Sequence, residues 1–221
     1  MEIPLKERAE RVYTTLLGTF GKPEWDPQPA LDELISTVLS QNTNDGNRDL
    51  AYQALRRAYP TWESVRDADT GEVIETIRPA GLANQKGPRI QKILRLITKD
   101  HGDLSLDFLS KWQPEEVYRW LTHLDGVGPK TASIVMLFSL GMPAFPVDTH
   151  VYRVSGRIGL RQQKTSVEET HAVMAALYAP EVYGAAHILL IYLGRRICHA
   201  RKPACALCPV SLLCLYPEKN L

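Results

Sequence analysis

Four cysteines near the C-terminal end are the clearest chemical feature of this 221-residue sequence. No other cysteine occurs in the chain, and their spacing is C-x6-C-x2-C-x5-C. Clustered thiolates are soft ligands that suit zinc or an iron–sulfur cluster, although four free buried cysteines remain an alternative. Zinc fingers and ribbons usually contain two C-x2-C pairs, so the wider loops favour a bulkier iron–sulfur cluster. The expected ligands are Cys198, Cys205, Cys208 and Cys214.

A basic loop lies between the first two cysteines. It reads His-Ala-Arg-Lys-Pro-Ala over residues 199–204, and Arg195 and Arg196 precede it. If a bound cluster holds this loop rigid at the surface, Arg201 and Lys202 can contact phosphate groups. A solvated run of charge is the alternative interpretation.

A glycine-rich turn is the second chemical feature, and it reads LDGVGPKTA over residues 124–132. Proline suits the first turn of a helix, so we expect one helix to begin at Pro114 and another to run from Pro129 to about Leu140. Glycines between two helices permit a sharp path with exposed amides, which bind anions without reading base sequence. A plain helix–turn–helix corner is the alternative. The expected contact residues are Gly126, Val127 and Gly128.

A lysine and an aspartate could together perform nucleophilic chemistry. Lys130 stands in the first turn of the second expected helix, and Asp148 follows eighteen residues later within FPVDTHVYRV. An unprotonated lysine amine is a nucleophile, and a carboxylate can stabilise positive charge that develops nearby. We expect the site to lower the pKa of Lys130, by desolvation or by the helix N-terminus. Asp148 also suits a helix N-cap, which could be its only role, and His150 is best explained as a core or hydrogen-bonding residue.

The elements that must position these residues are predicted to be helices. Apolar residues recur at helical spacing over residues 50–58 and 90–97, and Ser166 with Glu169 forms a capping-box pattern. Alternating β-branched runs with Asn-Gly turns are absent. The sequence therefore predicts an all-α protein with about ten or more helices.

Two proline-containing segments are candidate joints between units. They cover residues 22–29 and 141–146, and they would separate a central helical block, 28–142, from a second unit. The net charge of the chain is +1. Residues 143–221 contain nine Lys and Arg against five Asp and Glu, or +4, which leaves −3 on the remainder and is compatible with a basic face late in the chain.

Nothing in the sequence resembles a secretion signal or a membrane span. The N-terminal segment is charged and amphipathic, and apolar stretches such as Ala185–Leu193 are too short to cross a bilayer. We therefore expect a cytoplasmic protein without a membrane partner, in a reducing compartment where clustered cysteines bind metal.

The three signatures together resemble the endonuclease III family of helix-hairpin-helix DNA glycosylases. LDGVGPKTA, VDTHVYRV and the cysteine segment occur in the family's order, and the resemblance spans nearly the whole chain. It implies two helical domains with a central DNA-binding groove, a helix-hairpin-helix motif and a C-terminal [4Fe–4S] loop. One domain would be 28–142, and the other would combine 1–27 with 143–221. Lys130 would be the nucleophile that forms a Schiff base, and Asp148 the catalytic aspartate.

The resemblance implies base-excision repair by a glycosylase with AP lyase activity, which removes oxidised pyrimidines from duplex DNA. The partner would be double-stranded DNA with damaged bases or abasic sites, bound by a monomer associated with the nucleoid. Relatives with serine or tyrosine at the position of Lys130 lack the amine for a Schiff base. The alternatives are the same fold acting on uracil, mispaired thymine or an oxidised purine, a non-enzymatic iron–sulfur DNA-binding module, or a zinc-stabilised structural domain.

Two loops match the family's DNA-inserting segments. They are Ser40-Gln-Asn-Thr-Asn-Asp45 and Gly81-Leu-Ala-Asn84. Leu82 matches the apolar wedge, and either Gln41 or Asn42 matches the polar plug that fills the space of a flipped nucleotide. The asparagine-rich first loop also resembles the oxoguanine branch. An ordinary cap into the following helix is the alternative for that loop.

Overall fold

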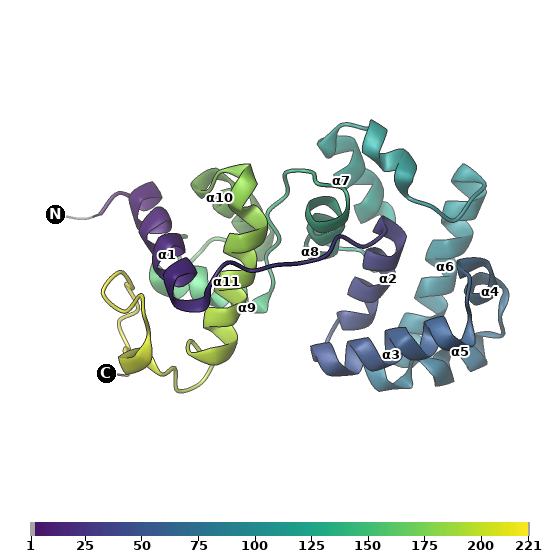
Figure 1. Ribbon diagram of the computed structural model, residues 1–221, viewed down its shortest axis with the longest axis horizontal. Helices are drawn as coiled ribbons and strands as arrows, with labels where there is room; N and C mark the ends of the chain where they lie inside the picture. Colours follow the sequence, from purple (N-terminus) through teal and green to yellow (C-terminus); the bar gives the residue numbers. More distant parts are fainter. Residues whose placement is uncertain (1–2, 221) are drawn as a thin grey trace. The chain divides into compact units, whose positions relative to one another are not determined.

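The computed structural model describes residues 3–220, and the regular structure in that range is entirely helical (Figure 1). The predicted all-α class is therefore confirmed. Eleven α-helices occur in the described range, together with five short helices labelled η. Their bounds are α1 Leu5–Phe20, α2 Ala30–Ser40, α3 Asp45–Ala58, α4 Trp62–Asp67, α5 Thr70–Thr76, η1 Arg78–Ala80, α6 Ala83–His101, η2 Asp107–Lys111, α7 Pro114–His123, α8 Pro129–Ile134, η3 Val135–Ser139, α9 Thr149–Ile158, α10 Val167–Leu177, η4 Pro180–Val182, α11 Tyr183–Arg196 and η5 Cys205–Leu207.

The chain divides into two compact units. The central unit runs from Pro27 to Met142. The discontinuous unit combines the segment that ends at Asp26 with the segment that begins at Pro143. Each unit has its own buried core.

The core of the central unit is built around α2. This helix contacts α3, α6, α8 and η3, so it is covered on several sides. Leu34, Ile35, Val38 and Leu39 are fully buried on it. Burial of such aliphatic side chains stabilises a fold by roughly 1.5–3 kcal/mol each, which makes α2 a rigid base for the loop that follows it.

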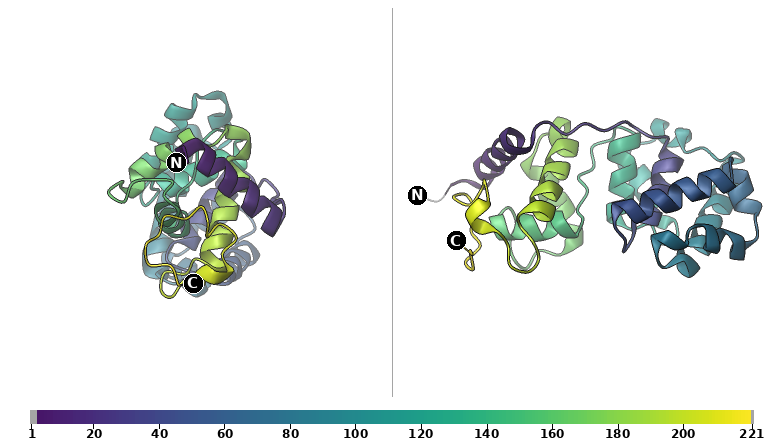
Figure 2. Two further views of the ribbon diagram at one scale, coloured as in Figure 1. Left: turned by 90° about the vertical axis from the view of Figure 1, so that its left-hand side faces the viewer. Right: turned by 60° about the horizontal axis from the view of Figure 1, so that its bottom comes forward.

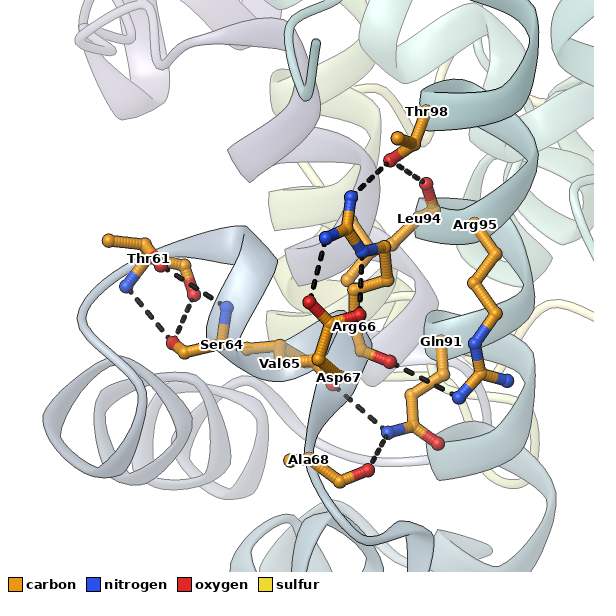
Figure 3. A network of polar contacts seen from close by, with 10 residues as sticks. All are labelled: Thr61, Ser64, Val65, Arg66, Asp67, Ala68, Gln91, Leu94, Arg95 and Thr98. Atoms are coloured by element: carbon orange, nitrogen blue, oxygen red, sulfur yellow. Dashed lines mark hydrogen bonds and ion pairs between the residues drawn. The ribbon is translucent and has the colours of Figure 1, made fainter. Parts of the chain in front are cut away.

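Helix α6 is tied to α4 by a network of polar contacts (Figure 3). The buried Gln91 amide donates to the backbone carbonyls of Val65 at 3.0 Å and Ala68 at 2.8 Å. The Arg66 guanidinium donates to the Thr98 hydroxyl at 2.9 Å. Because the last carbonyls of a helix have no partner within that helix, Gln91 stabilises the end of α4 and fixes it against α6.

The helix expected from Pro129 to about Leu140 changes its geometry partway. Regular α-helix ends at Ile134, and Val135–Ser139 forms a π-helix. The Leu140 amide donates to the Val135 carbonyl at 3.1 Å, five residues earlier, which is the π-helical pattern. Apolar periodicity cannot distinguish this wider turn from an ordinary helix, so the sequence did not predict it.

In the residues that the structure describes, the discontinuous unit contains four α-helices, α1, α9, α10 and α11. Helix α11 contacts both α9 and α1, although α1 is far from both in the sequence (Figure 2). The predicted capping box opens α10: the Glu169 amide donates to the Ser166 hydroxyl at 3.1 Å, and the Ser166 amide donates to the Glu169 carboxylate at 2.8 Å. This prediction is confirmed.

No single helix in the described part of the chain is long and apolar enough to cross a membrane. The helices Val167–Leu177 and Pro180–Arg196 are long and apolar enough for a membrane span only when they are taken together, and the chain bends by 113° between them.

Candidate active site

The glycine-rich turn joins α7 to α8 as predicted. Gly126 has φ +72°, a conformation that side chains rarely adopt. A Cβ atom there would also lie 2.1 Å from Arg89 Nε, so the residue must be glycine for two independent reasons. Gly128 has ordinary extended backbone, and a Cβ there would meet nothing within 4 Å. The space beside the start of α8 is therefore open.

Val127 does not fit its expected role as a DNA contact. Its side chain is only 4% exposed, and its amide donates to the Leu124 carbonyl at 3.0 Å. Neither group is available to a ligand. The structure therefore favours a packing role for Val127, since the apolar side chain anchors the turn in the core of the central unit.

Arg89 and Gln41 connect the turn to the first loop. The Gln41 amide nitrogen donates to the Gly126 carbonyl at 2.9 Å, and its amide oxygen accepts from Arg89 Nη1 at 3.2 Å. Both ends of the Gln41 amide are thus engaged within the protein. Asn42 is exposed and has φ +52°. Of the two expected plug residues, Gln41 is therefore held by Gly126 and Arg89, whereas Asn42 is exposed at the surface.

Sequence reasoning did not identify Arg89. Arginine on a helix is usually solvated, and the spacing of Arg89 along α6 carries no signal for contact with a turn far away in the sequence. Only its position against Gly126 shows that it helps to shape the loop and the turn together.

The three non-glycine residues with positive φ in the described range all belong to the expected DNA contacts. They are Asn42, Leu82 and Lys202, with φ between +49° and +52°. Asparagine tolerates this region, but a leucine there is strained by roughly 1–2 kcal/mol. Leu82 is also 45% exposed at the start of α6. Neither the strained backbone nor the exposed apolar side chain of Leu82 stabilises the fold, so this combination indicates a functional role.

Lys130 is the second residue of α8 and is half-buried. Thr131 and Ser133, which follow on the same helix, are buried. The backbone that carries Lys130 is therefore fixed by packing, as a nucleophile requires.

Asp148 is the N-cap of α9, which confirms the prediction for its local role. Its Oδ1 accepts a hydrogen bond from the Val151 amide at 2.7 Å, and the side chain stays half-exposed. The extended segment before it is pinned by two histidines. His171 Nδ1 lies 2.9 Å from the Phe145 carbonyl, and His187 Nδ1 lies 3.0 Å from the Pro146 carbonyl.

His150 has the hydrogen-bonding role expected of it. The Arg153 guanidinium donates to His150 Nδ1 at 3.1 Å, so that nitrogen accepts and cannot carry a proton. Burial is the main cause that lowers the pKa of His150. A neutral imidazole beside a fixed arginine is a structural pair rather than an acid–base group.

All four cysteines line one partly open cavity in the discontinuous unit. The cavity is small and partly open to solvent, and its other walls include Ile158, Leu193 and Val210. Within residues 3–220, no three His, Cys, Asp or Glu side chains converge as they would around one metal ion. The four thiols share one cavity, so together they are the candidate ligands of a bound metal or cluster.

Burial raises the pKa of the Cys208 and Cys214 thiols. Metal ligands must be thiolates, so iron would have to displace these protons. The Arg157 guanidinium donates a hydrogen bond to the sulfur of a third cysteine, Cys198, at 3.4 Å.

Arg157 also holds the basic loop. It donates to the carbonyls of His199 at 2.6 Å and Ala200 at 2.9 Å, and its guanidinium stacks on the Tyr216 ring. Arg201 and Lys202 extend from this anchored segment and are exposed. A loop with an ordered backbone and exposed cations is suited to bind phosphate. The sequence did not predict that Arg157 anchors it.

Comparisons with known proteins agree with these features. Residues 35–180 match the HhH-GPD superfamily of base excision DNA repair proteins. Endonuclease III of Thermotoga maritima is 35% identical over 85% of this chain and 83% of its own length, and that of Bacillus subtilis is 33% identical over 85% and 81%. A DNA glycosylase homologue of Arabidopsis thaliana is 38% identical over 62% of this chain, which matches only 46% of that longer protein.

Solved structures extend the match to nearly the whole chain. A non-covalent endonuclease III–DNA complex superposes with a TM-score of 0.84 and 28% identity, covering 96% of each chain. A trapped covalent endonuclease III–DNA intermediate gives 0.82 and 28% identity, covering 96% of this chain and 97% of that one.

The helix-hairpin-helix turn and these matches define the chain as a member of the HhH-GPD superfamily of base-excision DNA repair proteins. Within it, the chain belongs to the endonuclease III family, and it is a DNA glycosylase and lyase whose partner is DNA. That family generally carries a [4Fe–4S] cluster.

Proposed function

We propose that this enzyme removes oxidised pyrimidines from duplex DNA and then cleaves the strand through a Schiff base on Lys130. The observation that carries the proposal is the half-buried amine in the first turn of α8, directly after the open glycine turn. It stands at the position that matches the nucleophile in the family signature. The enzyme would act as a monomer on damaged or abasic sites in the cytoplasm.

The chemistry begins when the damaged nucleotide leaves the base stack, because a stacked base is out of reach. The glycosidic bond breaks with its electron pair going to the base, and positive charge grows on the sugar. We assign Asp148 to stabilise that charge. The neutral amine of Lys130 bonds to C1′ and loses a proton. The C1′–O4′ bond then breaks, the ring oxygen takes up a proton, and an imine between Lys130 and C1′ results. The imine acidifies the C2′ proton, and its removal expels the 3′ phosphate. Water then releases the enzyme.

A panel of duplexes with one defined lesion each tests the substrate proposal. We expect excision and a borohydride-trapped adduct with thymine glycol, and much slower reaction with uracil, a mispaired thymine or an oxidised purine. Each duplex should be run beside one with a preformed abasic site, which reports the lyase step alone. A preference for oxoguanine or uracil at equal abasic-site cleavage would overturn the substrate proposal and leave the enzyme class intact.

We propose that Asn42 is the plug and that Gln41 positions it. The engaged amide of Gln41 and the exposed, left-handed Asn42 support this division of roles. Asn42→Ala should slow excision from duplex DNA. Its stability cost should not exceed about 1–2 kcal/mol, because the side chain is exposed and alanine only tolerates the left-handed backbone less well than asparagine. Gln41→Ala should also destabilise the fold by about 0.5–1.5 kcal/mol, since it removes the hydrogen bonds to Gly126 and Arg89. Urea unfolding and single-turnover kinetics measure the two effects, and unchanged excision by Asn42→Ala would count against the assignment.

We propose that Cys198, Cys205, Cys208 and Cys214 hold a [4Fe–4S] cluster that orders the basic loop. Purified protein should contain about four irons per chain and absorb near ~400 nm. Cys208→Ser should lower the iron content and the DNA affinity. Leu212→Ser is the matched control, because Leu212 lies in the same segment but is almost fully exposed. One zinc per chain and no visible absorption would contradict the proposal.

A further inference from the structure

Lys86 is the most deeply buried cation in the described part of the central unit. It lies on α6 with 1% of its surface exposed. Its Nζ donates to the Leu39 carbonyl at 2.7 Å and to the Ala80 carbonyl at 2.8 Å. A buried ammonium is costly unless such hydrogen bonds compensate it, so the position of Lys86 needs a reason.

The two carbonyls stand at the beginnings of the two DNA-inserting loops. Leu39 lies in the last turn of α2, one residue before the segment 40–45. Ala80 is the last residue of η1, directly before the segment 81–84. Carbonyls at a helix end lack partners within the helix, and a cation is favourable there. One amine therefore holds both loops at the points where they leave the core.

We propose that Lys86 is a positioning residue that fixes the two loops relative to each other, so that Asn42 and Leu82 enter the DNA together. This inference rests on the proposed function of the loops. The left-handed backbones of Asn42 and Leu82 support it, because strained conformations persist only where the surroundings hold them firmly. No other residue described above bonds to the start of both loops.

The charged form of Lys86 carries a desolvation cost. Burial, together with the nearby positive charge of Arg89, lowers the pKa of Lys86 to about 8, so the fold disfavours its charged form. An apolar side chain of similar volume would avoid that desolvation. It could not, however, bridge two carbonyls from different segments. The bridge is therefore the feature that requires a lysine.

Lys86→Met tests the proposal because it keeps the length of the side chain and removes both hydrogen bonds. Lys99→Met is the matched control, since Lys99 is an exposed lysine on the same helix. Single-turnover rates are measured on a duplex with a lesion and on the same strand with an abasic site inside an unpaired bubble. The bubble needs no base stack to be opened. A fluorescent 2-aminopurine opposite the lesion reports the opening of the duplex.

We expect the rate of excision from the duplex and the 2-aminopurine signal to fall about tenfold or more in Lys86→Met. A displacement of the loops by about 1 Å is enough to lower a rate by this much. Cleavage in the bubble should stay within about twofold, and Lys99→Met should match the unmodified enzyme in every assay. Equal losses on both substrates, or full activity on both, would overturn the positioning role. If Lys86→Met does not fold, Lys86→Gln replaces it, because the shorter glutamine side chain cannot hold both carbonyls as the lysine amine does. The same ratio of duplex to bubble rates then decides. Failure of the unmodified enzyme to cleave the bubble substrate would instead contradict the proposed lyase function.

Discussion

Replacing Lys130 by glutamine is expected to abolish the borohydride-trapped DNA adduct. Glutamine is similar in length but has no nucleophilic nitrogen, so no imine can form. Cleavage at a preformed abasic site should fall on the order of 10⁴-fold or more, the scale on which loss of a covalent nucleophile acts. Because Lys130 is only half-buried, the unfolding midpoint should change little. Gel analysis of trapped complexes and single-turnover strand cleavage provide the measurements.

The control for Lys130 must exclude adventitious imines from surface lysines. Lys99→Gln removes an exposed amine of the central unit and should trap as much DNA as the unmodified enzyme. Binding of an uncleavable abasic duplex by Lys130→Gln should also persist, since the glycine turn and the basic loop remain. Undiminished trapping by Lys130→Gln would refute the assignment of the nucleophile.

The second large effect concerns Asp148, where asparagine separates charge from capping. Asparagine caps helices as well as aspartate does, and its oxygen can still accept the hydrogen bond from the Val151 amide. Asp148→Asn should therefore fold normally. Base excision should slow about 10²–10³-fold, as when one group that stabilises transition-state charge is removed. Single-turnover excision from a lesion duplex measures this loss.

Asp148→Ala completes the comparison, because alanine removes both the charge and the cap. It should excise as slowly as Asp148→Asn and should also lose about 0.5–2 kcal/mol in the free energy of unfolding. Full excision activity in Asp148→Asn, with loss only in Asp148→Ala, would show that the residue is merely a cap. Urea unfolding of both variants supplies the stability values.

Local physical chemistry explains which parts of the fold could be predicted. Pro114 and Pro129 begin helices, and Ser166 with Glu169 caps one, because these effects depend on residues within one turn of each other. The four cysteines were predicted as one group because they are close in sequence, and they do share a cavity. The π-helical turn after Ile134 was missed, since apolar spacing does not resolve one extra residue per turn.

Contacts between distant segments were outside the reach of such reasoning. The sequence could not show that the Gln41 side chain is held within the protein, because its acceptor, the Gly126 carbonyl, lies 85 residues away. It expected Val127 to contact DNA, whereas core packing hides that side chain. The roles of Lys86 and Arg157 as anchors likewise depend on carbonyls that only folding brings near them.

By itself, the sequence determined the helical class, the order of the signatures and the chemical groups available: an amine, a carboxylate and four thiols. These follow from residue type and short spacing, which act through local geometry. Only the tertiary structure decided which loop residues are held and which project, because a buried donor must find its acceptor wherever the chain places one. The physical reason is that hydrogen bonds and packing depend on distance in space and not on separation along the chain.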